Sequence, residues 1–155
     1  IAAATALVEA FDEAGEDASV SCRPEALLLF NPVFDNGPQG FRNSLVREYW
    51  KAISPIDHID ANTPPTFVIL GTKDKHIPVE TAKRFERLMT EQGRRCDLHL
   101  YEGRKHGFYN IWEDRNALAD TMIRMDRFLS SLGYLEGEPA LALVSATDDN
   151  HAQGL

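Results

Sequence analysis

The amino-acid sequence predicts an α/β domain with three layers, α/β/α, built on a parallel sheet. Three short apolar runs, at 26–30, 67–70 and 96–101, alternate with segments that have helical periodicity. Strands that alternate with helices pair in parallel through right-handed crossovers. The first two runs are apolar throughout, which is typical of strands covered on both faces.

The first elements are a helix, a strand and a long excursion. Apolar side chains at helical spacing predict an amphipathic helix over residues 1–14, with Gly15 as its stop. The apolar run at 26–30 is the first strand. The excursion, residues 31–64, is irregular and rich in aromatic side chains, and it includes one helical stretch at 44–52.

Two strand–helix pairs complete the domain. After the strand at 67–70, Pro78 suits the first turn of a helix that runs to about Gly93. The run at 96–101 alternates more than the other two, which indicates a strand near the edge of the sheet. A last helix is expected at 113–132, with apolar residues along one stripe.

Composition excludes several classes of function. The chain has 155 residues, is 43% hydrophobic, and has a net charge of −8 from 16 basic and 24 acidic residues. It has no basic patch with interleaved aromatic residues, so we expect no nucleic-acid partner. The sequence has no membrane span and no Gly-rich phosphate loop, and its two cysteines give neither a disulfide framework nor a metal-ligand spacing. We therefore expect no metal and no cofactor, and the sequence indicates no compartment.

The amino terminus predicts a partial domain. The chain opens at Ile1, directly in a helical pattern, and we expect an upstream part to be missing. Residues 1–133 are interpreted as the carboxyl-terminal half of one domain. Residues 134–155 have no clear period and are expected to form a mobile tail.

An acid and a histidine follow two neighbouring strands. Asp74 lies four residues after Leu70, and His106 lies five residues after Tyr101. Taken singly, an aspartate after a Gly-Thr turn is commonly a helix cap, and a His-Gly pair is commonly a turn. Because the carboxyl ends of parallel strands meet at one edge of the sheet, their joint placement predicts a catalytic acid–histidine pair.

The other histidines lack this strand-end placement. His99 lies inside a strand, His58 lies in a loop, and His76 lies in the same loop as Asp74, where a surface role or a pocket role is open. No His-Glu-x-x-His spacing is present, which argues against a zinc site.

Two motifs carry a resemblance to a known family. The segment Ile-Leu-Gly-Thr-Lys-Asp-Lys-His-Ile-Pro at 69–78 and the segment Tyr-Glu-Gly-Arg-Lys-His-Gly-Phe at 101–108 resemble the acid and histidine segments of α/β-hydrolases. They are most similar to the acetyl-esterase and hormone-sensitive-lipase-like group, with prolyl-oligopeptidase-like and dienelactone-hydrolase-like groups nearby. The resemblance implies a serine hydrolase in which Asp74 is the triad acid and His106 the base.

One member of that triad is absent from the sequence. The chain contains no Gly-x-Ser-x-Gly, and residues 1–4 are similar to the helix that follows the nucleophile in this family. The serine and the oxyanion hole are thus expected outside the chain, which would be inactive alone. The missing amino-terminal half of the domain is then its expected partner.

The resemblance also places a substrate pocket. The family often inserts a lid or a pocket wall at a position equivalent to 31–64, so Phe34, Phe41 and Trp50 become candidate wall residues, and Phe108 and Tyr109, beside the histidine, are further candidates. The implied substrate is a small-molecule ester, either a short-acyl ester or a sugar ester.

Two other functions stay open: a prolyl-oligopeptidase-like peptidase and a non-catalytic binding module descended from a hydrolase. A flavodoxin-like or receiver-like domain is disfavoured, because the chain has no phosphate loop or acidic cluster near the first strand. A direct hydrogen bond between Asp74 and His106, with the other ring nitrogen facing a cleft, would favour the enzyme over the binding module.

Overall fold

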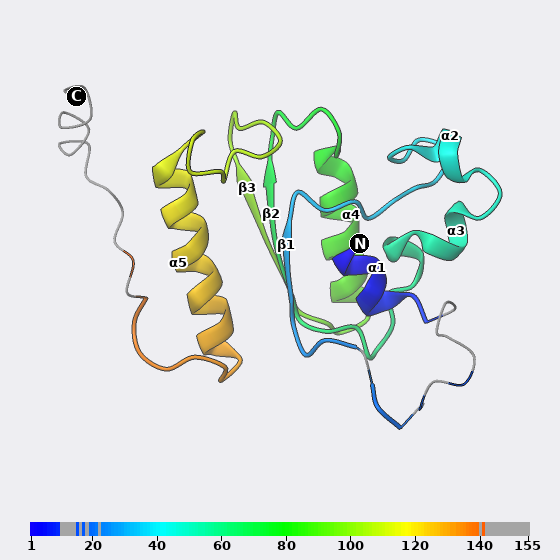
Figure 1. Cartoon of the computed structure of the whole chain (residues 1–155), viewed down its shortest axis with the longest axis horizontal. Coiled ribbons are helices and arrows are strands. Elements are labelled where there is room, and N and C mark those ends of the chain that lie inside the picture. Colours follow the sequence, from blue (N-terminus) through cyan, green and yellow to red (C-terminus); the bar gives the residue numbers. More distant parts are fainter. Residues whose placement is uncertain (10–14, 16, 18, 22, 140, 142–155) are drawn as a thin grey trace. The chain divides into compact units, whose positions relative to one another are not determined.

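The structure is a computed structural model that describes residues 1–9, 15, 17, 19–21, 23–139 and 141. The chain divides into two compact units, Ile1–His106 and Gly107–Leu155. Figure 1 labels the elements of both units.

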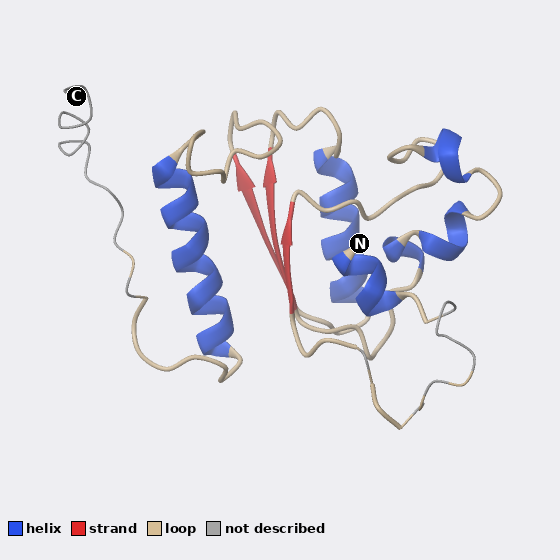
Figure 2. Ribbon diagram, viewed as in Figure 1, coloured by secondary structure: helices blue, strands red, loops and turns tan. Residues whose placement is uncertain are grey.

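The first unit is built on a parallel sheet of three strands in the order β1-β2-β3. The strands are β1 (Leu27–Phe30), β2 (Thr66–Gly71) and β3 (Cys96–Tyr101). Both pairings are parallel, so all three carboxyl ends lie at one edge of the sheet (Figure 2). The predicted parallel α/β arrangement is confirmed, and β3 is an edge strand of this sheet, as its alternating pattern indicated.

One long helix supplies much of the core of this unit. Helix α4 (Val79–Glu91) buries Ala82, Phe85 and Met89, which lie on one face because they are three and four residues apart. These side chains form one apolar cluster with buried residues of β1 and β2 and with helix α1 (Ala2–Leu7). The helix predicted over residues 1–14 extends too far: the β-branched Val8 takes an extended conformation and ends α1, while residues 10–14 lie outside the described residues.

The excursion at 31–64 forms two short α-helices and a 3₁₀ turn. The single helix predicted at 44–52 is wrong: α2 spans Asn43–Val46, α3 spans Trp50–Ile53, and η1 (Pro55–Asp57) follows. The break falls at Tyr49, whose backbone (φ −127°, ψ 13°) is not helical. Side-chain contacts anchor the segment to the core, above all the Phe34 ring stacked on Phe85 with ring centroids 3.7 Å apart.

The second unit contains helix α5 (Arg115–Ser131), close to the predicted 113–132. The helix begins after Asp114, whose carboxylate accepts a hydrogen bond from the Ala117 N–H at 2.9 Å and so satisfies a free donor of the first turn. Most of the predicted tail, 134–155, lies outside the described residues.

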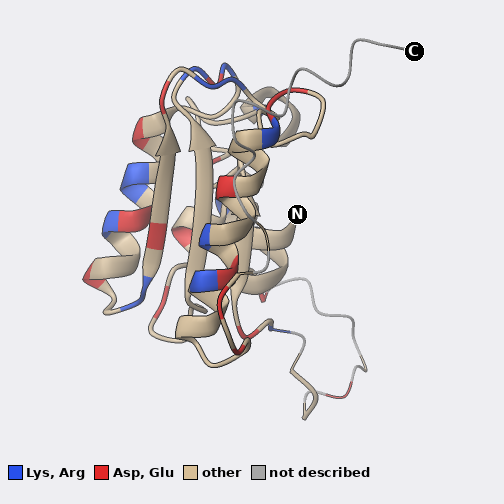
Figure 3. Cartoon of the chain, turned by 90° about the vertical axis from the view of Figure 1, so that its left-hand side faces the viewer, with Lys and Arg blue, Asp and Glu red and all other residues tan. Residues whose placement is uncertain are grey.

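Both long helices carry charged side chains of both signs, as Figure 3 shows. On α4, Lys83 pairs with Glu80 at 3.1 Å, and on α5, Arg124 pairs with Asp120 at 2.7 Å. In the described part of the chain, no helix has the length and apolarity needed to cross a membrane.

Candidate active site

The acid loop begins where β2 ends. The Asp74 N–H donates to the Gly71 carbonyl at 3.0 Å, which closes a tight turn directly after the strand. The Asp74 Oδ1 atom accepts the backbone N–H groups of His76 at 2.7 Å and Ile77 at 3.1 Å. This carboxylate is therefore held by the chain just before α4 starts, and its side chain is fully buried, with 0% of its surface exposed.

The histidine loop is bonded to the acid loop through the backbone. The Thr72 N–H donates to the Tyr101 carbonyl at 3.0 Å, and the Lys73 N–H donates to the Arg104 carbonyl at 2.8 Å. The Gly103 N–H donates to the Thr72 hydroxyl at 2.8 Å. The two loops thus form one bonded unit rather than two independent turns.

Gly71 allows the two loops to approach each other. A Cβ atom at this position would lie 2.4 Å from the Arg104 carbonyl oxygen and 2.8 Å from that of Lys105. Both contacts are shorter than any side chain tolerates, so only glycine fits between β2 and the histidine loop.

The two loops bring Asp74 and His106 into direct contact. The His106 Nδ1 atom lies 2.8 Å from Asp74 Oδ2. A carboxylate only accepts hydrogen bonds, so Nδ1 carries the proton and neutral His106 has its lone pair on Nε2. The His106 side chain is 46% exposed, and its Nε2 atom makes no hydrogen bond to the residues that the structure describes.

A third side chain, Asn31, joins this pair and was not predicted. Asn31 directly follows β1, is 5% exposed, and has a left-handed backbone (φ 46°). Its Nδ2 donates to Asp74 Oδ2 at 2.7 Å and lies 3.4 Å from His106 Nδ1. A signal was available: Asn31 ends a strand that pairs with β2, and the strand-end rule used for Asp74 applies to it equally.

Hydrogen bonding keeps the Asp74 carboxylate charged. Burial alone would raise the pKa of Asp74, because a buried carboxylate loses its hydration. The bonds from the backbone of His76, from His106, from the backbone of Ile77 and from Asn31 outweigh this effect, and the pKa lies below its usual value. Asp74 is therefore ionised at neutral pH and can stabilise a positively charged histidine.

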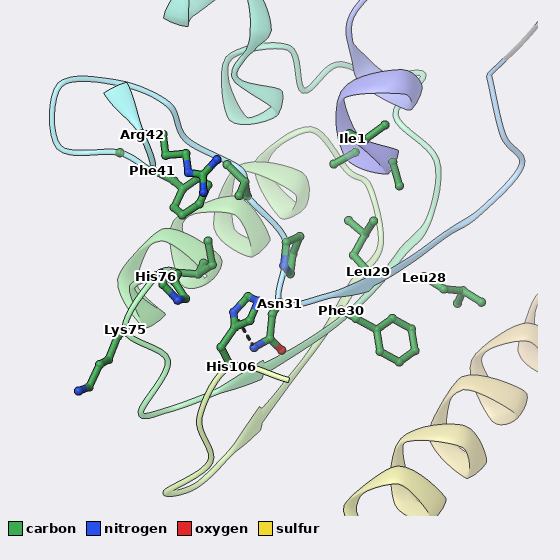
Figure 4. A pocket seen from close by; sticks show the side chains of 16 residues that line it. Ile1, Leu28, Leu29, Phe30, Asn31, Phe41, Arg42, Lys75, His76 and His106 are labelled. Atoms are coloured by element: carbon green, nitrogen blue, oxygen red, sulfur yellow. Dashed lines mark hydrogen bonds between the residues drawn. The ribbon is translucent and has the colours of Figure 1, made fainter. Parts of the chain in front are cut away.

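His106 and Asn31 open into a cleft of about 990 Å³ within the first unit. Its other walls come from the start of α1, from β1 and its end, from the excursion and from the acid loop: Ile1, Ala2, Ala3, Leu28, Leu29, Phe30, Pro32, Val33, Gly40, Phe41, Arg42, Lys75, His76 and Ile77. Figure 4 shows Phe41, Arg42 and His76 on one side of the cleft. The His76 ring meets the His106 ring edge to face at 5.1 Å and the Phe41 ring at 6.1 Å.

The predicted pocket residues have different positions. Phe34 is fully buried in the core against Phe85 and does not line the cleft. Trp50 lines a smaller hollow of about 340 Å³ between the excursion and α4. Phe108 and Tyr109 belong to the second unit, where their rings meet edge to face at 5.6 Å.

A parallel sheet with an acid and a histidine after consecutive strands is the carboxyl-terminal part of an α/β-hydrolase fold. The chain belongs to the prolyl oligopeptidase family, whose model matches residues 25–131. No curated protein matches the chain.

Solved structures of one enzyme are similar to this chain. Esterase 2 of the planctomycete Thermogutta terrifontis, in its apo form, is 35% identical, with a TM-score of 0.79 over 88% of this chain and 53% of that chain. The same esterase with propionate bound is 34% identical with a TM-score of 0.77, again covering 88% and 53%. The form phosphonylated by sarin is 34% identical with a TM-score of 0.79, covering 88% and 54%. The chain thus spans about half the length of these esterases and is similar to a serine-hydrolase scaffold.

Proposed function

We propose that this chain supplies the acid and the general base of a serine carboxylic-ester hydrolase, and that the nucleophilic serine and the oxyanion hole lie outside it. The observation that carries the proposal is the 2.8 Å hydrogen bond between buried Asp74 and His106, whose Nε2 atom is left without a partner among the described residues. This is the arrangement in which a histidine can accept a proton from a nucleophile.

In the proposed reaction, His106 transfers the proton and Asp74 stabilises the positive charge that His106 acquires. The Nε2 atom takes the proton from the serine as the serine attacks the ester carbonyl, and it then gives the proton to the leaving alcohol. The Asp74 carboxylate fixes the Nδ1–H tautomer throughout and stabilises the imidazolium that forms between these steps. A water molecule then attacks the acyl-enzyme, with His106 again accepting and returning the proton, so that the carboxylic acid is released and the serine is regenerated.

The proposed substrate is a small-molecule ester, either a short-acyl ester or a sugar ester. The cleft beside His106 supports this choice, because it combines the aliphatic residues of β1 with the Phe41 ring. The similar esterase of T. terrifontis has been solved with propionate and with butyrate bound, which are short acyl groups.

Peptide hydrolysis is the second candidate, because the matching family model is that of prolyl oligopeptidases. The two activities share the triad and differ in the group that leaves, so the acid–histidine geometry does not separate them. A non-catalytic binding module is less well supported, since it gives no reason for a buried carboxylate to be bonded to an exposed histidine.

The test joins this chain to the amino-terminal half of T. terrifontis esterase 2, at the point where the two chains begin to align. We expect the chimera to hydrolyse p-nitrophenyl acetate and to be labelled by a fluorophosphonate probe, while the 155-residue chain alone does neither. Asp74→Asn should lower kcat by about 10⁴-fold, and His106→Ala by about 10⁶-fold. A proline-containing peptide substrate, assayed in parallel, separates the esterase from the peptidase.

Two results would contradict the proposal. Labelling of the isolated chain would place a nucleophile within it. A folded chimera that keeps its turnover after His106→Ala would mean that this histidine is not the base. Asn43→Ala is the matched control, because it removes an asparagine hydrogen bond (to the Asn36 carbonyl, 2.8 Å) outside the cleft.

A further inference from the structure

We infer that Asn31 is a positioning residue for the acid–histidine pair: its side-chain amide fixes the Asp74 carboxylate in the orientation that receives His106. The inference rests on the proposed function for its catalytic meaning. Its physical content, a hydrogen bond from one strand end that controls a carboxylate on the next, can be measured without turnover.

Two donors from different strands converge on one oxygen. Asn31 Nδ2 reaches Asp74 Oδ2 at 2.7 Å from the end of β1, and His106 Nδ1 reaches the same atom at 2.8 Å from beyond β3. The other oxygen, Oδ1, is taken by the acid loop itself. With both oxygens held by donors, the carboxylate is fixed against rotation, and the histidine ring meets an acceptor that is already in place.

The orientation of the Asn31 amide follows from chemistry. A carboxylate repels the amide oxygen, so the nitrogen must face Asp74. Figure 4 shows this nitrogen beside the His106 ring. The amide oxygen, Oδ1, is buried and has no hydrogen-bond partner among the residues that the structure describes.

Two features of Asn31 are energetically unfavourable. The backbone of Asn31 is left-handed (φ 46°), a conformation that side-chain-bearing residues adopt rarely and asparagine tolerates best. A buried oxygen without a partner is also unfavourable. A residue kept only for stability would avoid both costs, whereas a residue that must place a donor at Asp74 Oδ2 has few alternatives.

The other polar and basic side chains around the cleft do not replace this donor. His76 faces the ring of His106, and Lys75 and Arg42 line the cleft, but none of the three side chains makes a hydrogen bond to Asp74. Asn31 thus provides the single side-chain hydrogen bond to Asp74, other than that of His106, among the described residues.

The test is an NMR titration of the 155-residue chain with ¹³C-labelled carboxyl groups and ¹⁵N-labelled histidine rings. In Asn31→Leu, which is similar in volume and has no donor, we expect the pKa of Asp74 to rise by about one unit. In Asn31→Asp, the added negative charge should raise the pKa of His106 by about one unit as well. Asn43→Ala should change neither value, because its hydrogen bond lies in the excursion.

Retention of dispersed amide resonances shows that a variant is folded. If Asn31→Leu does not fold, Asn31→Asp, which keeps the shape of the native side chain, provides the test. Unchanged pKa values of Asp74 and His106 in the folded variants would overturn the inference. In the chimera, Asn31→Leu should lower kcat about 10-fold with KM unchanged, and an equal loss through KM would also count against it. A chimera without turnover would refute the proposed function alone, because the titration does not depend on it.

Discussion

Two regions of the first unit border the same cleft and are built differently. The strand-end loops, residues 71–77 and 101–106, are joined largely by backbone hydrogen bonds, with Gly71 packed against the Arg104 carbonyl. The excursion, residues 31–64, has backbone turns of its own and adds side-chain anchors, such as the Ser54 hydroxyl and the Phe34 ring stacked on Phe85. Backbone joining suits groups that must keep a fixed separation, whereas a side-chain anchor depends on the particular residue that provides it.

The largest expected effect comes from a matched pair of glycines. A Cβ atom at Gly71 or at Gly40 would lie 2.4 Å from a carbonyl oxygen, of Arg104 and of Asp35 respectively. At Gly71 the oxygen lies in the bonded loops, where neither side can yield, so Gly71→Ala should lower the free energy of unfolding by about 3 kcal/mol. Gly40→Ala should cost about 1 kcal/mol, because the excursion can shift.

Urea denaturation followed by circular dichroism measures both costs. Equal losses in the two variants, or a larger loss at Gly40, would refute the difference in rigidity between the two regions. If Gly71→Ala lowered the free energy of unfolding by clearly less than about 3 kcal/mol and left the His106 resonances unchanged, the histidine loop would be able to shift without disturbing the contact between Asp74 and His106.

Sequence and structure agree best where the signal is local. The strands at 66–71 and 96–101 were predicted almost to the residue, because continuous or alternating apolar runs between turn residues permit few other structures. The proximity of Asp74 and His106 followed from the strand-end rule, although their catalytic role stays a prediction. The sequence does not single out Asn31 in the same way, because Asn-Pro after a strand is an ordinary turn signal.

Tertiary contacts decided the remaining elements. The aromatic residues of the excursion were expected to form a pocket wall, but their direction depends on packing that no local pattern reveals. Phe34 turns inward onto Phe85, while Phe41 faces the cleft. The two four-residue helices α2 and α3 are too short to be stable alone, so the helical pattern at 44–52 could not locate the break between them.

A second pair of variants tests the hydroxyls of the two regions. The Ser54 hydroxyl is fully buried; it accepts the Asn36 N–H at 2.9 Å and donates to the Trp50 carbonyl at 2.8 Å. Ser54→Ala removes the acceptor of the Asn36 N–H, while the Trp50 carbonyl keeps the bond from the Ser54 N–H at 3.0 Å, and the change should cost about 1–2 kcal/mol. Thr72→Ala removes one acceptor, for the Gly103 N–H, at a partly exposed site, and should cost about 0.5–1 kcal/mol.

Loss of a hydroxyl should therefore destabilise the excursion more than the strand-end loops. The greater rigidity that we expect of the strand-end loops thus concerns their backbone contacts only. Thermal unfolding of the two variants beside Thr72→Ser, which keeps the hydroxyl, checks this order. If Thr72→Ala were the more costly change, side-chain bonds would matter more to the strand-end loops than their geometry indicates.

The smallest effect is confined to acidic pH and compares two aspartates. Asp74 in the acid loop and Asp60 in the excursion both have a pKa below the usual value. At Asp60, burial raises the pKa, and bonds from Asn62 and Thr63 together with the charge of Arg23 outweigh it. A carboxyl whose pKa is lower in the folded chain stabilises that chain above its unfolded pKa of about 3.9, and the contribution is lost as the pH falls through the folded value.

Stability should therefore fall below about pH 4 in the wild type, and less steeply in Asp74→Asn and in Asp60→Asn. The difference between the urea midpoints at pH 7 and pH 3 measures how steeply stability falls with pH in the wild type and in each variant. We expect the larger flattening in Asp74→Asn, because its carboxylate is fully buried while that of Asp60 is 48% exposed to screening solvent. If the two variants flattened the slope equally, burial would add nothing to the linkage, and the acid of the proposed triad would be no more tightly coupled to folding than an ordinary turn aspartate.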